Sequence, residues 1–470
     1  MSDLLNIVYY IVPFVVLLGV LVFVHEFGHF IIARILKVQV VAFSLGFGKE
    51  LWSRTDKYGT RWKISAIPLG GYCQFLGDAD ASSSTVVDSL EKLSEDEKKK
   101  AFPLQPSWKK IAIVVAGPLF NYLFAIVLFW GLFFGFGRMV YPSVVGAVMP
   151  GEAADLAGIK VGDKIISING KETPDFQVLG NEVSLSETDA VDVAIERPIM
   201  VKTTLEEVFL SATKHEKILG VVSFEHKYDK ETRKKIPAPA VVANVLPNSA
   251  AQKAGIMVND AIDEINGTPI QNFDELKTYI EQHADEELEI SLRRPMIVKV
   301  TLKDTQYTDE NGRKVKRRML GIESKPELTV AERMGFVESV YASFEETYNL
   351  TETTLRGLGQ MITGRRGGKD VGGIIRIAEM SGDISKSGGM LGFIYFMALL
   401  SVNLGLINLL PIPVLDGGSL VIFIIECVTG RELKEEVRDL IFKVGILIIL
   451  AIMVLATWND IVHLISRWFD

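Results

Sequence analysis

The sequence has only two cysteines, Cys73 and Cys427, and no long basic segment. Two thiols so far apart provide neither a disulfide framework nor a C-x-x-C metal or redox site, so the soluble parts must fold without covalent links. The missing basic block and the net charge of −8 argue against nucleic acid as a partner. Apolar residues are abundant, at 48% of the chain. This fraction predicts a protein with membrane-spanning parts joined to soluble parts.

Basic residues are also absent before the first apolar stretch. That stretch therefore lacks the start of a secretory signal and is predicted to remain as a helix. Twelve basic residues lie in 37–110 and four more in 426–443, so the positive-inside tendency places both connections in the cytoplasm and both termini outside. Four stretches are long enough to span a bilayer, at about residues 4–36, 111–136, 391–410 and 441–458.

The first span contains the motif His25-Glu26-Phe27-Gly28-His29. On an α-helix, residues four apart share a face, so both imidazoles can bind one zinc ion while Glu26 stands beside its open position. Ionisable side chains at membrane depth are costly and indicate function. The alternative is a helix end where the histidines cap the helix or meet lipid headgroups.

The third span ends in Asn408-Leu409-Leu410-Pro411-Ile412-Pro413-Val414-Leu415-Asp416. Two prolines break the helix at membrane depth, which is tolerated where backbone lines a cavity or is buried in protein. The break presents one carboxylate, Asp416, as a third zinc ligand. A helix N-cap is the alternative role for Asp416.

Residues 38–76 show short alternating runs punctuated by glycines, which predict strands or hairpins. The segment Gly70-Gly71-Tyr72-Cys73-Gln74-Phe75 could be a sheet edge near the zinc to which an extended substrate adds as a strand. An ordinary surface hairpin is the alternative. In the second span, Asn121 is either a polar contact between helices or part of the chemistry.

The middle region contains an internal repeat, because the pattern of residues 150–170 recurs at 247–267 with an offset of 97 (247 − 150). Both copies resemble PDZ domains in their small-residue helix start, the following Asp and the Asn-Gly hairpin. Leu219-Gly220 and Leu320-Gly321 could be the glycine loops before the peptide-receiving strands. The two copies could read peptide ends or act as a steric gate. Residues 327–362 repeat apolar side chains at helical spacing and predict amphipathic helices on the outer membrane surface, or a packing helix beneath the PDZ pair.

Taken together, the motifs resemble the site-2 protease family of the bacterial regulator-of-sigma-E type. The resemblance covers nearly the whole chain through His25-Glu26-x-x-His29, Gly117-Pro118-x-x-Asn121, the PDZ pair and Asn408-x-x-Pro411-x-Pro413-x-x-Asp416. It implies one catalytic Zn²⁺ on His25, His29 and Asp416, with Glu26 as the catalytic base of peptide hydrolysis. It also implies substrate-binding roles for Asn408, Pro411, Pro413 and the membrane-associated loop residues Gly70, Gly71 and Tyr72.

The fold expected is a multi-pass α-helical membrane protein of about four spans, with a membrane-associated β-hairpin region and two tandem PDZ domains. The predicted parts are 1–37, first span; 38–107, β-loop and charged linker; 108–137, second span; 140–230 and 231–325, PDZ domains; 326–388, amphipathic helices and a glycine-rich loop; 389–425, third span with the Asp ligand; 426–440, cytoplasmic loop; 441–466, fourth span.

The resemblance places the protein in a bacterial inner membrane with the PDZ domains in the periplasm. Expected partners are the lipid bilayer and single-pass substrates already shortened outside, such as an anti-sigma factor, or leftover signal peptides. Peptide ends could bind the PDZ domains. The alternative function is a non-enzymatic membrane scaffold whose metal is structural or absent, although a structural site has no use for Glu26. A metal transporter is a third alternative, but the chain lacks repeated ionisable residues along its spans.

Overall fold

The computed structural model describes residues 2–77, 93–186, 188–211, 214–224, 227–228, 235–308, 314–325, 330–363 and 372–469. It divides into two compact units, one made of residues 1–138 and 331–470 and the other of residues 139–330. Most of the predicted charged linker, at 78–92, and the first part of the predicted glycine-rich loop, at 364–371, lie outside the described residues.

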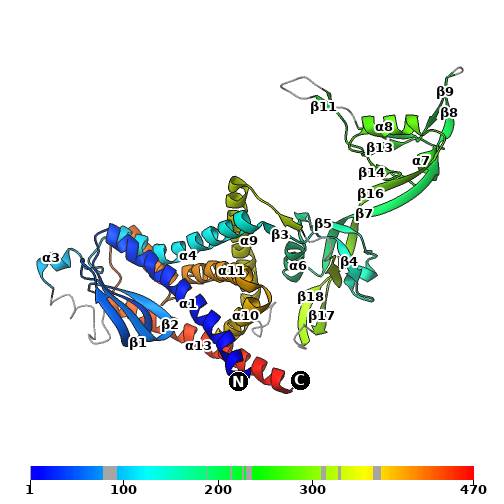
Figure 1. Cartoon of the computed structure of the whole chain (residues 1–470). Coiled ribbons are helices and arrows are strands. Elements are labelled where there is room, and N and C mark those ends of the chain that lie inside the picture. The colour runs from blue at the N-terminus through cyan, green and yellow to red at the C-terminus, as the bar shows by residue number, and fades with distance from the viewer. Residues whose placement is uncertain are drawn as a thin grey trace. The chain divides into compact units, whose positions relative to one another are not determined.

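The first unit is a helical bundle with a small sheet at one end (Figure 1). Its elements are α1 (Ser2–Ile35), β1 (Val40–Thr55), β2 (Arg61–Phe75), α3 (Glu95–Lys98), α4 (Ser107–Phe136), α9 (Phe336–Ile362), α10 (Ile374–Ser387), α11 (Gly389–Leu409), α12 (Asp416–Thr429) and α13 (Glu435–Phe469). The strands β3 (Arg138–Val140) and β20 (Val330–Glu332) carry the chain between the units.

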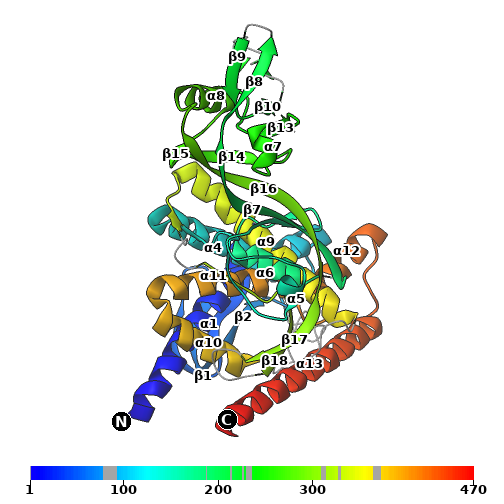
Figure 2. The same cartoon turned by 90° about the vertical axis from the view of Figure 1, so that its right-hand side faces the viewer.

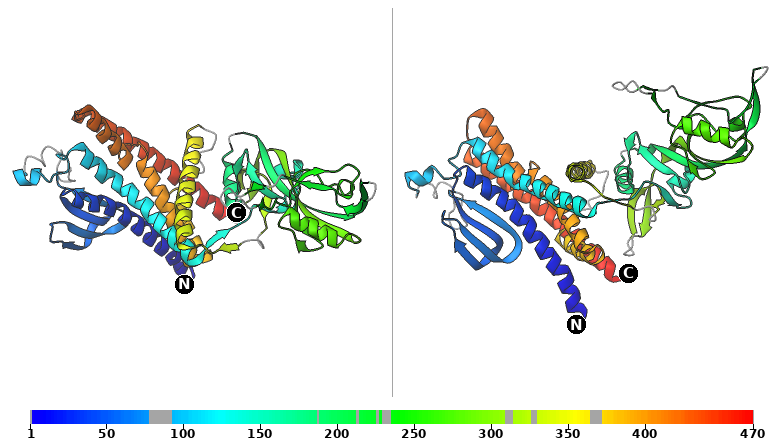
Figure 3. Two further views of the ribbon diagram at one scale, coloured as in Figure 1. Left: turned by 90° about the horizontal axis from the view of Figure 1, so that it is seen from above. Right: turned by 45° about the horizontal axis from the view of Figure 1, so that its top comes forward.

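Four helices in the described part of the chain are long and apolar enough to cross a membrane, over Tyr10–Ile35, Ser107–Phe136, Gly389–Leu409 and Glu436–Val462. These ranges confirm the four predicted spans. Helix α4 packs against both α1 and α11 (Figure 3). Phe129 and Ala125 of α4 are fully buried against Ala398 and Val402 of α11, so α4 is the central helix of the bundle.

The predicted strands in 38–76 form a sheet in which both chain segments bend back. Residues 42–45 of β1 pair with 71–74 of β2 on one side and with 61–64 on the other. The C-terminal part of β2 is therefore an outer strand of this sheet, as expected for residues 70–75. Buried Phe43 packs with Phe30 of α1 and Ile113 of α4, which attaches the sheet to the helices.

An ion pair ties the turn of this sheet to the end of α1, where Arg34 bonds Asp56 and Thr60. Burial alone would raise the pKa of Asp56, but hydrogen bonds from Arg34 and from the backbone N–H groups of Tyr58 and Thr60 lower that pKa to about 2. Asp56 therefore stays ionised at any ordinary pH. This contact is lost only when the pH falls from about 4 towards 2.

One prediction is corrected between α9 and α11. The glycine-rich loop expected within 326–388 does not extend to residue 388, because α10 begins at Ile374. The helix starts here because a carboxylate from a distant part of the chain caps its first turn. Asp460 of α13 is buried and accepts hydrogen bonds from the backbone N–H groups of Gly373 and Ile375, so it caps α10 across the bundle.

The second unit contains the repeat, because the secondary structure of residues 145–211 recurs at 242–308 with the offset of 97. The unit has twenty elements in its described residues. They are β4 (Val145–Val148), α5 (Ala153–Leu156), β5 (Lys164–Ile168), β6 (Lys171–Glu172), α6 (Phe176–Ser184), β7 (Ala190–Thr204), β8 (Glu206–Ser211), β9 (Lys214–Ile218), β10 (Val221–Ser223), β11 (Lys227–Tyr228), β12 (Lys235–Ile236), β13 (Val242–Val245), α7 (Ala250–Lys253), β14 (Ala261–Ile265), β15 (Thr268–Pro269), α8 (Phe273–Gln282), β16 (Glu287–Thr301), β17 (Lys303–Thr308), β18 (Lys314–Met319) and β19 (Ile322–Ser324).

The equivalent long strands β7 and β16 pair with each other in antiparallel fashion at the centre of a six-stranded sheet of order β15-β14-β16-β7-β5-β6 (Figure 2). Arg197 pairs with Arg294, and these two residues occupy the same position in the two copies (294 − 197 = 97). The two halves of the sheet are thus related by an approximate twofold axis through this pair.

The division predicted at residue 230 is corrected by the two cores. One core combines residues of 145–195 with Val300, Leu302 and Leu320. The other core lies within residues 205–292. Because β7 and β16 each run from one core into the other, the second domain is inserted into the first and does not follow it.

Each copy contains the same buried ion pair. Asp163 is fully buried and accepts bonds of 2.8 and 2.7 Å from Nε and Nη2 of Arg197, and the Lys160 backbone N–H also donates to it. These bonds to Asp163 raise the pKa of Arg197. Asp260 and Arg294 repeat the pair in the second copy.

We expect Asp163→Ala to lower the stability of the second unit by about 3–5 kcal/mol, because it leaves Arg197 and the Lys160 N–H without their carboxylate. The measurement is the urea dependence of proteolysis of the full chain in detergent. Glu281→Ala is the control, since it removes an exposed i,i+4 pair with Lys277 that stabilises little. Equal resistance of Asp163→Ala and wild type would contradict the expectation.

Candidate metal centre

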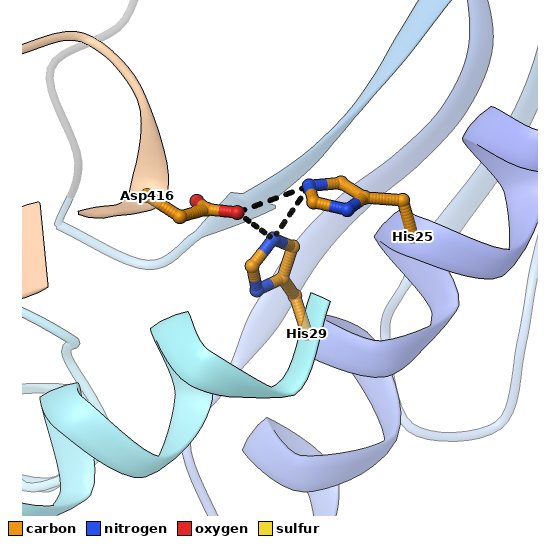
Figure 4. A group of neighbouring side chains, drawn as sticks. All are labelled: His25, His29 and Asp416. Carbon is orange, nitrogen blue, oxygen red and sulfur yellow. Dashed lines mark hydrogen bonds and ion pairs between the residues drawn. The ribbon is translucent and has the colours of Figure 1, made fainter. Parts of the chain in front are cut away.

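Three side chains from two distant parts of the sequence meet inside the helical bundle (Figure 4). His25 and His29 project from one face of α1, and their Nε2 atoms lie 3.3 Å apart. Oδ2 of Asp416 lies 3.1 Å from Nε2 of His25 and 3.4 Å from Nε2 of His29. The structure therefore brings together the three predicted zinc ligands.

The backbone before Asp416 explains how this carboxylate reaches α1. Helix α11 ends at Leu409 and α12 begins at Asp416, so the two prolines break the helix as predicted. Val414 has a φ of 82°, a conformation that is costly for a β-branched residue. Asp416 is the first residue of α12 and the helix has no side-chain cap bond, so the N-cap role is not the one observed.

The ligand atoms fit a metal ion. All three lie within 4.8 Å of one another. Oδ2 of Asp416 is buried and has no hydrogen-bond partner among the described residues. A buried carboxylate oxygen facing two imidazole nitrogens is costly unless a cation lies between them, and two imidazoles with one carboxylate are a known catalytic zinc ligand set.

The other ring nitrogens are held by α4. Nδ1 of His29 lies 2.8 Å from the carbonyl oxygen of Ile113, so Nδ1 carries the proton and Nε2 is left for a metal. Nδ1 of His25 lies 3.1 Å from the side-chain amide of Asn121, whose Oδ1 is buried without a partner among the described residues. If Nε2 of His25 binds a metal, Nδ1 of this ring carries the proton and needs an acceptor. A 180° flip of the Asn121 amide group places Oδ1 there as that acceptor.

Asn121 is therefore a polar contact between two helices that lies directly at the predicted metal ligands. A second residue of α4, Gly117, was not assigned to the site from sequence. A Cβ at this position would lie 2.3 Å from Nε2 of His29 and 2.9 Å from Cε1 of His25. A glycine beside a proline within an apolar span is the signal that could have indicated this close approach.

Glu26 lies at the junction of α1 and the outer strand of the sheet. A Cβ at Gly71 would lie 2.8 Å from a methyl group of Val22 and 3.6 Å from Cγ of Glu26. The strand thus passes directly beside the predicted base.

The remaining predicted site residues lie at different distances from the ligands. The Nδ2 atom of Asn408 is 3.5 Å from Nε2 of His25. Gly70 packs against the ring of Phe47, on which Tyr72 stacks. Pro411 and Pro413 lie in the connection between α11 and α12, and Pro413 contacts α13 where Gly445 allows close approach.

An apolar helical bundle that gathers two imidazoles, one carboxylate and an adjacent glutamate defines a zinc peptidase of the membrane-embedded class. Comparison with known proteins agrees with this class. The chain belongs to peptidase family M50, which it matches over residues 13–452. It is a zinc metalloprotease of the site-2 type, so the alternatives of a non-enzymatic scaffold and a transporter are set aside.

Its relatives cover almost the whole chain. Protease RseP of Yersinia pestis is 34% identical over 97% of this chain and 99% of its own length. The regulator of sigma E protease of Salmonella typhi is 32% identical over 97% of this chain and 99% of its own length.

We expect Gly117→Ala to abolish stoichiometric zinc binding, because the new methyl group would occupy the space beside both imidazoles. The loss of zinc is tested by measuring the zinc content of the purified protein with elemental mass spectrometry. Gly131→Ala is a matched control in the same helix, where a Cβ meets no atom within 4 Å. Full zinc occupancy in Gly117→Ala would contradict the proposed ligand geometry.

Proposed function

We propose that this protein cleaves the transmembrane segments of single-pass proteins within a bacterial inner membrane. The observation that carries the proposal is the position of Glu26. It lies beside Gly71 of the outer β-strand, on the span-length helix that also carries His25 and His29 of the ligand cluster. A peptidase site at this depth meets substrates that are themselves in the membrane.

The chemistry assigns a task to each residue. His25, His29 and Asp416 would hold one zinc ion, which when bound lowers the pKa of water and polarises a carbonyl. Glu26 accepts a proton from the attacking water and passes it to the leaving amine. Asn408, beside His25, would hold the substrate main chain.

A transmembrane helix hides its amide groups in its own hydrogen bonds, so it must unwind locally before cleavage. Unpaired backbone groups are costly in lipid. The outer strand of residues 70–75 offers main-chain groups that would satisfy them by strand addition. We therefore assign Gly70, Gly71 and Tyr72 to substrate binding, and we propose that the prolines Pro411 and Pro413 shape the opposite wall.

The proposed orientation places the connection 37–110 in the cytoplasm, and both termini and the second unit in the periplasm. The substrates we propose are those already shortened outside, of the anti-sigma factor type, together with remnant signal peptides. Relatives that carry the name regulator of sigma E protease support the first class.

Each half of the second unit has features of a PDZ domain. The loop residue Gly220 has a φ of 86° and precedes β10, which pairs with β13 on one side. Gly321 has a φ of 74° and precedes β19, which pairs with β4. We propose that these strands receive peptide ends or that the pair excludes substrates with large outer domains.

We expect Glu26→Gln to lower cleavage of a labelled single-span substrate in detergent by about 10²–10⁴-fold while zinc content stays unchanged, because only the proton acceptor is lost. Glu95→Gln, in the exposed helix α3, is the control. Cleavage by Glu26→Gln at the wild-type rate would exclude Glu26 as the base. Absence of cleavage by the zinc-loaded wild type for every substrate tested would oppose the proposed function.

The gate proposal makes a separate prediction. Deleting residues 144–322 should allow cleavage of a substrate that still carries its outer domain, while the shortened substrate is cleaved with and without the deletion. Gel assays of both substrates measure this. If the deletion variant cuts the shortened substrate and leaves the full-length one intact, the second unit is not a gate.

A further inference from the structure

The loop between α11 and α12 is held from two sides at Pro413, three residues before the proposed ligand Asp416. On one side, a Cβ at Gly418 of α12 would lie 2.7 Å from Cα of Pro413. On the other side, a Cβ at Gly445 of α13 would lie 2.6 Å from the carbonyl oxygen of Pro413. Real Cβ atoms essentially never come within 3.0 Å of such neighbours, so both helices contact this proline only because they carry glycine there.

The backbone directly after this contact is in a costly conformation. Val414 has a φ of 82°, in the left-handed region that β-branched residues rarely adopt. Such a conformation persists only where the surroundings impose it. The N–H of Leu415 donates to the carbonyl oxygen of Ile412 over 3.1 Å, and α12 begins with the next residue, Asp416. A shift of Pro413 is therefore passed to Asp416 through one short, hydrogen-bonded turn.

Helix α13 has few other buried positions. Among its residues whose burial is described, only Gly445, Ala456 and Asp460 are buried. Asp460 caps α10, and near the other end of α13 the side chain of Arg438 donates to the buried Glu426 of α12. Positions 438, 445 and 460 fall within about 60° of each other around the helix axis. One face of α13 is thus fastened at both ends and rests on the loop between them.

We propose that Gly445 is a positioning residue for the zinc ligand Asp416. It acts through Pro413, because α13 holds this proline against α12 and so keeps the carboxylate at the two imidazoles. His25 and His29 are oriented separately by α4, so α13 acts on the carboxylate. The inference rests on the proposed ligand set and adds to it a helix that supplies no ligand.

The test is a double-mutant cycle on the zinc affinity of the full-length protein in detergent, measured by competition with a chelator. Gly445→Ala adds one methyl group beside Pro413. We expect zinc affinity to fall about 10–100-fold, as is usual when the support of a metal ligand is lost. Because alanine favours a helix over glycine, a weakened α13 cannot explain that loss. In the Asp416→Ala background the same substitution should have no further effect, since no carboxylate is left to position.

Two further variants complete the cycle. Asp460→Ala releases one end of α13 without adding an atom beside Pro413, and we expect it to lower zinc affinity in the same way, again only while Asp416 is present. Ala451→Val is the control, because this position of α13 is exposed and the added methyl groups should leave zinc affinity unchanged.

The outcomes separate the inference from the proposed function. Wild-type zinc affinity in Gly445→Ala or in Asp460→Ala would overturn the positioning role. An equal loss with and without the Asp416 carboxylate would also overturn it, since α13 would then only stabilise the fold. If Asp416→Ala itself binds zinc as tightly as wild type, the proposed ligand set is wrong and the inference falls with it.

Discussion

The structure depends on bringing two imidazoles and one carboxylate within hydrogen-bond distance of each other among apolar helices. Such a cluster is unfavourable in a low-dielectric interior unless a cation balances it and the rings are fixed in one tautomer. Helix α4 meets the second condition through Ile113 and Asn121, and it can do so only because Gly117 lets it approach the rings. The same close packing recurs at Gly417, where a Cβ would lie 2.1 Å from the carbonyl oxygen of Leu410.

The parts that could be predicted from sequence are those in which a short pattern determines the chemistry. The spacing of His25 and His29 places both on one helix face, and the prolines before Asp416 mark the helix break. The four spans follow from the length of their apolar stretches. The family comparison confirms the class of enzyme, whereas the roles of Asn408 and of the strand edge remain proposals.

What could not be predicted depends on residues far apart in the chain. Nothing in residues 371–378 shows that Asp460, more than eighty positions later, supplies the cap that starts α10. Nothing local in 42–45 shows that this segment pairs on both of its sides. The sequence shows the repeat, but the residue pattern of the two long strands fits either core. The insertion of one domain into the other could therefore not be predicted from it.

That insertion determines the order in which the second unit can be completed during synthesis. The core that begins at Val145 also needs Val300 and Leu320, so it stays incomplete while the chain between them emerges. The inserted core, within residues 205–292, has all its members earlier. The domain that begins first is thus finished last, and a nascent chain interrupted near its middle exposes an unfinished apolar surface that chaperones or proteases can recognise.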